Sequence, residues 1–381
     1  MIFLDHAATS PVRREALEAM WPYLTGAFGN PSSQHRLGDE AARALAWARA
    51  TVADATGARP GDVVFTSGGT EADNLALKGI ALATPRGRHL VISPVEHEAV
   101  LESASYLERL HGFEVSLVAV DEHGLVHPDA LARVLRDDTT LVSVQLANNE
   151  VGTVQPVAEL AGLAHAAGAR VHTDAVQAAG WLPLGLDDLG VDALSLAGHK
   201  VGAPKGTGAL VARGRVPLEP VLHGGGQERG RRSGTENVAG AVAFATALQL
   251  AEAERAETSE RVGVLRRELV ARVLGEVPGA RLTGDPESRL PGTASFVFPG
   301  AAGEAVLLEL ERDGVLSSSG SACAVGRDEP SHVLTAMGIS PELAQTAVRF
   351  TLGRETSEDE VRAASDAVLR AVSAVRGIVA V

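Results

Sequence analysis

A lysine and an aspartate follow two neighbouring apolar runs of the sequence. Lys200 ends the segment AGHK after the strand-like residues 192–196, and Asp174 follows the strand-like residues 169–171. Because parallel strands present their carboxyl ends at one edge of a sheet, we expect the amine and the carboxylate to lie close together. Pyridoxal phosphate (PLP) needs this pair, since a lysine binds its aldehyde and a carboxylate keeps its pyridine nitrogen protonated.

The scarcity of lysine supports this interpretation. Only Lys78, Lys200 and Lys205 occur among 34 basic residues, so a lysine at this place is not explained by a general preference for that residue type. A surface position in a glycine-rich turn is the alternative for Lys200, and the accompanying aspartate argues against it.

A glycine-rich turn resembles an anion cradle. The segment SGGTE (67–71) joins the strand-like residues 62–66 to a helical pattern. Gly69 lets the backbone approach an anion, Thr70 adds a hydroxyl, and a helix N-terminus offers free N–H groups and a positive dipole end. Helix caps use the same residue types, so the segment alone does not decide between a cradle and a cap.

Other polar side chains follow further strand-like runs. His97 comes after residues 89–92, Asn149 after 140–146, and Gln177 follows Asp174 closely. An imidazole at a strand end can stack on a cofactor ring and move protons. Amides suit a ring hydroxyl or a substrate carboxylate. Each residue alone would be an ordinary loop residue, and their agreement across several strand ends favours a shared site.

The single cysteine is a candidate nucleophile. Cys323 lies in a segment of Ser, Gly and Ala (316–327) without apolar periodicity, which indicates an exposed, mobile loop. An exposed thiol in such a loop can attack an electrophile. Arg349 stands between apolar residues; it is either a strand residue that snorkels to solvent or a bidentate clamp for a carboxylate.

Bulk properties limit the classes of function. The chain has 381 residues, 45% hydrophobic residues and a formal charge of −14, which is typical of a soluble globular protein and argues against direct nucleic-acid binding. No apolar run reaches membrane-spanning length, and the N-terminus has no signal-peptide pattern. One cysteine forms no internal disulfide, which fits a cytoplasmic protein.

The order of elements predicts the fold class. Strand-like and helical patterns alternate from residue 61 onward, with strands at 62–66, 89–92, 114–120, 140–146, 169–172, 193–196 and 208–211. This alternation predicts an α/β protein with a mostly parallel sheet flanked by helices. The helical residues 238–275 and the less regular remainder predict a smaller α+β domain. We expect a large PLP-binding domain at 13–255 and a small domain at 1–12 and 256–381 that carries Cys323.

These segments resemble the group I cysteine desulfurases (NifS/IscS type) of the class V aminotransferase group, which are fold-type I PLP enzymes. The resemblance covers nearly the whole chain, and its most specific element is the cysteine segment. It is carried by LDHAATSP (4–11), GNPSS (29–33), FTSGGTE (65–71), NNEVG (148–152), the aspartate and lysine segments, GGGQERG (224–230), RSGT (232–235), SSGSAC (318–323) and VRFTLGR (348–354).

The resemblance implies a role for each matched residue. Lys200 would bind the cofactor aldehyde and later act as acid and base, Asp174 would pair with the pyridine nitrogen, and His97 would stack on the ring. The remaining matched residues would contact the phosphate, the ring oxygen or the substrate. The phosphate would be held by Gly69, Thr70, His199 and, from the second subunit of a homodimer, Thr235. The ring oxygen or the substrate would be contacted by Asn149 and Gln177. The substrate carboxylate would be held by Arg349 with Asn30.

The implied reaction converts L-cysteine to L-alanine and leaves a persulfide on Cys323. The persulfide would pass to a sulfur-acceptor protein, such as an iron–sulfur scaffold or a tRNA-thiolating protein. The motifs contain no resident metal site, although Cys323 could ligate an iron–sulfur cluster in transit.

Two residues depart from the family pattern. Ala197 stands where many members have a serine that bonds the cofactor phosphate, which predicts weaker phosphate binding. Glu98 stands where the residue after the histidine is often basic, and nothing in the sequence explains it. Two alternatives remain open: a class V aminotransferase or lyase for another small amino acid, and a non-catalytic scaffold of a sulfur pathway.

Overall fold

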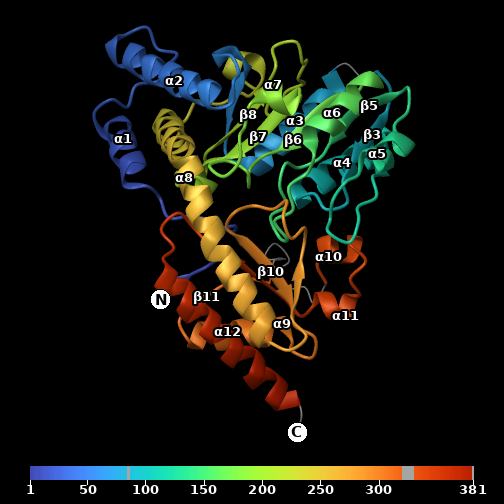
Figure 1. The fold of residues 1–381 in the computed structure, drawn as a ribbon. Helices are drawn as coiled ribbons and strands as arrows, with labels where there is room; N and C mark the ends of the chain where they lie inside the picture. Colours follow the sequence, from blue (N-terminus) through green and yellow to red (C-terminus); the bar gives the residue numbers. More distant parts are fainter. Residues whose placement is uncertain (84–85, 320–329, 380–381) are drawn as a thin grey trace.

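The computed structural model describes residues 1–83, 86–319 and 330–379. Its upper part is a seven-stranded sheet with helices on both faces, and its lower part contains two smaller sheets (Figure 1). The predicted class, an α/β protein with a mostly parallel sheet, is confirmed. The large sheet has the order β2-β8-β7-β6-β5-β3-β4, with β2 at Val63–Thr66, β3 at His89–Ile92, β4 at Glu114–Leu117, β5 at Thr139–Ser143, β6 at Arg170–Asp174, β7 at Ala193–Ala197 and β8 at Gly208–Ala212.

The large sheet is parallel except at β8, which runs antiparallel to both β2 and β7. Successive side chains along a strand point to opposite faces of the sheet, so each strand contributes side chains to the hydrophobic core on each face. Val64 and Leu210 belong to the core under two of the helices, whereas Val63 and Val211 belong to the core on the other face. Two helices cover the core that contains Val64 and Leu210: α3 (Gly69–Ala83) and α4 (Glu98–His111). The core on the other face is covered by α1 (Arg14–Thr25), α2 (Arg36–Ala55), α6 (Val157–Ala166) and the first half of α8 (Val238–Glu276). The short helices α5 (Pro128–Val134) and α7 (Leu186–Leu189) also contribute to this second core.

The lower part packs around the second half of α8. Its antiparallel sheet has the order β12-β10-β9, and a two-stranded parallel sheet pairs β1 with β11. These strands are β1 (Ile2–Phe3), β9 (Arg281–Thr283), β10 (Thr293–Val297), β11 (Val315–Leu316) and β12 (Ala347–Thr351), and the accompanying helices are α9 (Gly303–Arg312), α10 (His332–Ala336), α11 (Pro341–Ala344) and α12 (Glu358–Val379). A capping box begins α12, since Ser357 Oγ accepts from Glu360 N–H and a Glu360 carboxylate oxygen accepts from Ser357 N–H.

Helix α8 joins the two parts, as Figure 1 shows. Its buried residues up to Ala251 belong to the core of the large sheet, and those from Val262 belong to the core of the small sheet. This change of partner supports a domain boundary near residue 255, which stays a prediction. In the described part of the chain, every helix is too short or too polar to span a membrane.

Candidate active site

Asp174 is a buried carboxylate at the end of β6. It is 7% exposed, and its Oδ1 accepts a hydrogen bond of 2.8 Å from Val176 N–H. Burial raises the pKa of Asp174, while the charges of His97 and Lys200 oppose this rise. Both side chains therefore lie within electrostatic range of the carboxylate, as the sequence predicts.

Lys200 lies in the turn that directly follows β7, the neighbour of β6. Its Nζ donates to the carbonyl oxygens of Ala7 and, at 3.0 Å, Ala8. The Ala7 oxygen also accepts from Gln177 Nε2 at 3.0 Å. The N-terminal segment therefore covers the lysine on one side and links it to the amide expected in the site.

Gly69 begins α3 in a space that admits no side chain. A Cβ at this position would lie 2.7 Å from Val176 Cγ2 and 3.4 Å from Ala197 Cβ. The start of the helix is thus pressed against the ends of β6 and β7, where Asp174 and Lys200 also lie. The free N–H groups and positive dipole end at this helix start would suit an anion, and Thr70 is exposed in the first turn.

His199 is neutral in this environment. Burial and the charge of Lys200 lower the pKa of His199 to about 4. Its Nδ1 lies 3.2 Å from the hydroxyl oxygen of Thr9. A neutral imidazole beside the lysine offers hydrogen bonds to a phosphate without a full positive charge.

His97 is the N-cap residue of α4, and its Nδ1 accepts a 3.1 Å hydrogen bond from Ala99 N–H. This bond orients the ring at the end of the loop after β3. Asn149 follows β5, and its carbonyl oxygen accepts from Arg349 Nη1 at 2.8 Å. The loop after β3 therefore brings an imidazole to the edge of the sheet where Asp174 lies, and the loop after β5 brings the backbone of Asn149 to Arg349.

Arg349 is a buried strand residue of β12, only 2% exposed, which excludes the snorkelling alternative. Its Nη2 forms an ion pair of 2.7 Å with Asp5 Oδ1. Asn30, expected beside Arg349, lies in a turn before α2, where its Oδ1 accepts from Ser32 N–H at 2.9 Å.

The loop that contains Thr235 is anchored at two places. The Glu228 carboxylate accepts from both terminal nitrogens of Arg49, at 2.6 and 2.7 Å, and from Phe65 N–H of the edge strand β2. Arg232 forms an ion pair of 2.8 Å with Glu71 in the first turn of α3. Thr235 itself is exposed and lines a hollow with Ser67 of the same chain.

Cys323 lies outside the described residues, but both flanks of its segment lie beside the site. Ser318 N–H donates to Arg349 O at 3.2 Å, and Arg349 N–H donates to Ser318 O at 2.6 Å. On the other flank, Ser331 Oγ donates to Glu150 Oε2 at 2.6 Å. The two flanks are thus attached to the arginine and to the residue after Asn149.

Sequence reasoning missed a group of buried ionisable residues behind Asp174. Burial, with Asp174 as a neighbour, raises the pKa of Asp73 and of Glu96 well above the usual range. Burial lowers the pKa of His172 to about 3, and this ring contacts Ser143 Oγ and Ser195 Oγ at 2.9 Å each. Asp73 lies in the helical pattern that the sequence predicts after residues 67–71, and it is one of the buried residues of α3.

Within the described ranges, no cluster of three or more His, Cys, Asp or Glu residues is arranged to hold a metal ion. The described part of the site contains the amine of Lys200, the buried carboxylate of Asp174, the start of α3 and the buried guanidinium of Arg349.

Comparison with known proteins identifies the class. The sequence matches the class V aminotransferase family over residues 2–363. The cysteine desulfurase IscS of Dictyoglomus turgidum is 44% identical over 99% of this chain and 96% of its own. That of Methanosarcina thermophila is 46% identical over 94% of this chain and 89% of its own. A NifS-like protein of known structure superposes with a TM-score of 0.91 at 38% identity, covering 98% of this chain and 99% of the other.

The chain belongs to the class V aminotransferase family, whose enzymes use PLP. Its resemblance to the NifS/IscS-type group, expected from the sequence, is confirmed. The residues present fit this cofactor. The space at Gly69 that a Cβ would fill, the buried carboxylate of Asp174 and the amine of Lys200 match the phosphate, the pyridine nitrogen and the aldehyde of PLP.

Proposed function

We propose that this protein is a cysteine desulfurase. L-Cysteine and the Cys323 thiol give L-alanine and a Cys323 persulfide: the carbon–sulfur bond of the substrate breaks, a sulfur–sulfur bond forms, and the proton of the thiol balances the one gained by the substrate carbon. The observation that carries the proposal is the position of Arg349, whose backbone pairs with a flank of the Cys323 segment and whose side chain contacts Asn149 of the site. Relatives named cysteine desulfurase over nearly the full length support it.

The residues around Asp174 would hold PLP, which when bound supplies an electron sink for the substrate. Asp174 would keep the pyridine nitrogen protonated, and Lys200 would hold the aldehyde carbon. His97 would lie against the ring. The phosphate would be bound by Gly69, Thr70, His199 and the partner subunit's Thr235, and the ring oxygen by Asn149 and Gln177.

Arg349 would bind the substrate carboxylate with help from Asn149 and Asn30. The Lys200 amine, once released, would move a proton at the substrate carbons. Cys323 would receive the sulfur. Three residues lie between it and Ser319, so four Cα–Cα steps keep the two Cα atoms within about 14 Å of each other. Ser318 pairs directly with Arg349, so this limit is compatible with attack by the thiol on a substrate held at that arginine.

The protein would act as a homodimer. Trp21 and Phe28, at the end of α1 and just after it, are 65% and 68% exposed, and Leu24 between them is also exposed. Large apolar side chains grouped in this way mark protein interfaces. A dimer would also bring Thr235 to the partner's phosphate site.

The sulfur would leave through an acceptor protein in the cytoplasm, such as an iron–sulfur scaffold or a tRNA-thiolating protein. The single cysteine of the chain supports a carrier role, because no second thiol is present to reduce the persulfide internally. Capture of proteins that accept labelled sulfur from the Cys323 persulfide would identify the acceptor.

Turnover of L-cysteine tests the proposed reaction. The protein should release alanine and sulfide when a reductant is present, and brief exposure to cysteine without reductant should add one sulfur to the Cys323 peptide. The Cys323→Ala variant should keep the visible absorption band of the cofactor and its change on adding cysteine, yet lose sulfide release. Turnover by this variant at the wild-type rate would instead support an aminotransferase or lyase of another small amino acid.

Borohydride reduction tests the lysine assignment independently. Reduction should fix the cofactor on the peptide that contains Lys200. A label on Lys78 or Lys205 would contradict the assignment.

A further inference from the structure

The side chain of Arg349 already faces a carboxylate from its own chain. Asp5 Oδ1 lies 2.7 Å from its Nη2, and the carbonyl oxygen of Asn149 lies 2.8 Å from its Nη1. The Arg349 side chain is 3% exposed and that of Asp5 is 21% exposed. An ion pair with so little exposure is screened weakly by solvent, so the charge of Asp5 acts strongly on anything bound at this arginine.

The backbone fixes Asp5 in this position. Leu4, immediately before it, is fully buried in the core of the small sheet. Leu4 N–H donates to Leu316 O at 2.8 Å, and Thr351 N–H donates to Leu4 O at 2.7 Å. Asp5 therefore cannot withdraw from Arg349 by a loop motion alone; only its side chain can turn.

The same N-terminal segment continues to the lysine. The carbonyl oxygens of Ala7 and Ala8 accept from Lys200 Nζ, and Ser10 N–H donates to His199 O at 3.0 Å. Asp5 is thus only a few residues from a backbone that touches the reactive amine. A substrate whose carboxylate meets Arg349 and whose amino group meets Lys200 would lie along this segment.

We propose that Asp5 is a specificity-determining residue, whose negative charge sets how strongly Arg349 binds the carboxylate of an amino-acid substrate. The inference rests on the proposed function through the assignment of Arg349. The Asp5–Arg349 ion pair has little net charge, so a single carboxylate binds modestly and a second carboxylate on the same ligand is repelled. The site therefore favours small amino acids with an uncharged side chain over dicarboxylic ones.

The Asp5→Asn exchange separates charge from shape. The amide oxygen of Asn can still accept the hydrogen bond from Arg349, so orientation is retained while the negative charge is lost. We use 3-mercaptopropionate as the probe, because it has the carboxylate and thiol of cysteine without an amino group. Its dissociation constant from the PLP-bound protein, measured by titration calorimetry, should fall at least tenfold in the variant. The neutral analogue 3-mercaptopropanol should bind both proteins equally.

Kinetics and a matched control complete the test. The KM for L-cysteine should fall in Asp5→Asn, and inhibition by L-aspartate should increase. Asp366→Asn removes a carboxylate that pairs with Arg272 at 2.8 Å on the surface between α8 and α12, and should change neither quantity. Asp5→Glu keeps the charge and should keep the probe affinity within about threefold of the wild type, since charge rather than shape is responsible.

Unchanged probe affinity in Asp5→Asn would overturn the inference and show that Asp5 only supports the fold. If this variant does not fold, Asp5→Ser serves the same comparison, with the rise in melting temperature on adding propionate as the readout. The proposed function fails separately, by the absence of sulfide release from the wild type, and the probe measurements remain valid in that case.

Discussion

Three buried carboxyl groups lie within electrostatic range of one another, yet only one of them lies near both His97 and Lys200. Burial raises the pKa of Asp73, Glu96 and Asp174, and only Asp174 has His97 and Lys200 to oppose that rise. Like charges in a region of low dielectric do not ionise together. These directions favour a negative charge on Asp174, the carboxylate that we propose meets the pyridine nitrogen of PLP.

The Asp73→Asn variant should be more stable than the wild type at high pH. The pKa of Asp73 is raised in the folded chain. Its contribution to the free energy of unfolding is therefore fully present below the unfolded pKa of about 4, and it is lost as the pH rises toward the pKa of the folded chain. Asn stays neutral throughout. The difference in free energy of unfolding should grow by about 1.4 kcal/mol per pH unit across that window. Urea denaturation of the cofactor-free protein at several pH values measures it.

The exposed Asp129→Asn variant is the control for this experiment, because it removes a carboxylate that is not buried. A stability difference between Asp73→Asn and the wild type that stays constant with pH would contradict the localisation of charge.

Ala197→Ser should strengthen cofactor binding. Ala197 is buried at the end of β7, and its Cβ lies against the space at Gly69 where the phosphate is expected. A hydrogen bond to a charged group contributes roughly 1.5–3 kcal/mol. The dissociation constant of PLP, followed by fluorescence, should fall about tenfold or more. The control is Ala193→Ser, at the opposite end of the same strand and on the same face, which should leave the dissociation constant of PLP unchanged. Equal dissociation constants for the wild type and Ala197→Ser would show that no new hydrogen bond forms.

Residue types and their order along the chain are sufficient to predict that the main site residues lie together. Lys200, Asp174 and His97 follow strands that end at one edge of the sheet. Parallel strands place their carboxyl ends at the same edge, so this proximity can be predicted from the order of strands along the chain. The roles of Asp5 and Asp73 depend on contacts across the fold. Asp5 meets Arg349 at a separation of 344 residues, which no local pattern reveals.

At the scale of elements, the loop 224–237 is held by charges rather than by an apolar core. Glu228 and Arg229 have positive φ values of 48° and 60°, which are strained for residues with a side chain. The strain persists because Glu228 is buried against Arg49 and also accepts from the edge strand β2. This anchor fixes the loop that presents Arg232 and Thr235.

Glu228→Ala should destabilise the protein strongly. The exchange removes the carboxylate partner of the half-buried Arg49 guanidinium, and losing one partner of a fully buried pair costs about 3–5 kcal/mol, which is the upper limit here. Cofactor affinity should fall as well, because the loop loses its anchor. Chemical denaturation and PLP titration measure the two effects.

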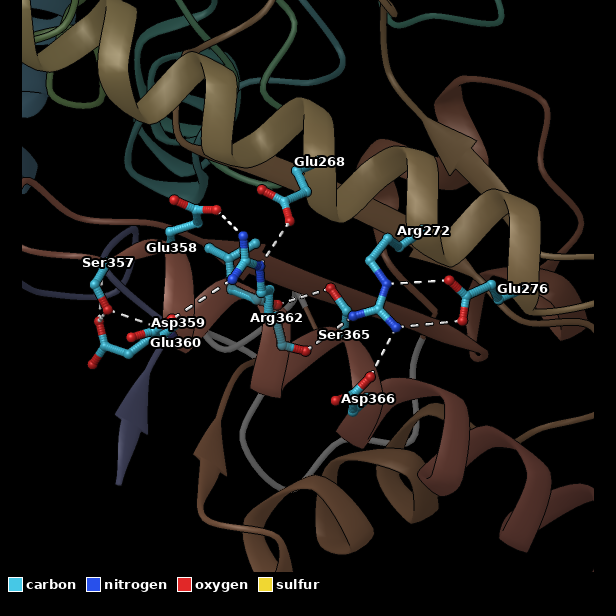
Figure 2. Close-up of polar contacts among 11 residues, drawn as sticks. Glu268, Arg272, Glu276, Ser357, Glu358, Asp359, Glu360, Arg362, Ser365 and Asp366 are labelled. Carbon is cyan, nitrogen blue, oxygen red and sulfur yellow. Dashed lines mark hydrogen bonds and ion pairs between the residues drawn. The ribbon is translucent and has the colours of Figure 1, made fainter.

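The matched control lies in the surface network shown in Figure 2, where Arg272 pairs with Glu276 and Asp366. Asp366→Ala should reduce the free energy of unfolding by less than about 1 kcal/mol, because exposed ion pairs contribute little. A loss for Glu228→Ala as small as that for Asp366→Ala would mean that the loop does not depend on the Arg49 pair.

Elements of the large sheet were predictable because their periodicity is strong and both faces are apolar. The missed elements have mixed patterns for physical reasons. Helix α1 exposes Leu17, Trp21 and Leu24 on its outer face, so its apolar residues do not form a single inward stripe. Ser295 of β10 is paired with Arg349 of β12. Polar residues at buried positions interrupt the apolar pattern by which a strand is predicted from the sequence.

At the scale of the whole molecule, the exposed apolar end of α1 predicts association. Trp21→Glu places a charge in this surface and should weaken the homodimer by at least tenfold in dissociation constant, since burial of an unpaired charge at an interface is costly. Sedimentation equilibrium should show dissociation at concentrations where the wild type is dimeric. Leu308→Glu, at an exposed position on α9, is the control. An unchanged dimer in Trp21→Glu, or full activity of a monomer, would contradict the prediction.

The pairing of the N-terminal segment with β12 also determines when the enzyme becomes active during its synthesis. Leu4, Asp5 and Ala7 find their partners at residues 349 and 351, so these residues wait for almost the entire chain to be translated. At 5–20 residues per second, that interval is about 20–70 s. A nascent chain stalled before residue 349 has Lys200 but lacks Arg349, the arginine that we propose binds the substrate carboxylate. Under that proposal, incomplete products of the ribosome cannot mobilise sulfur.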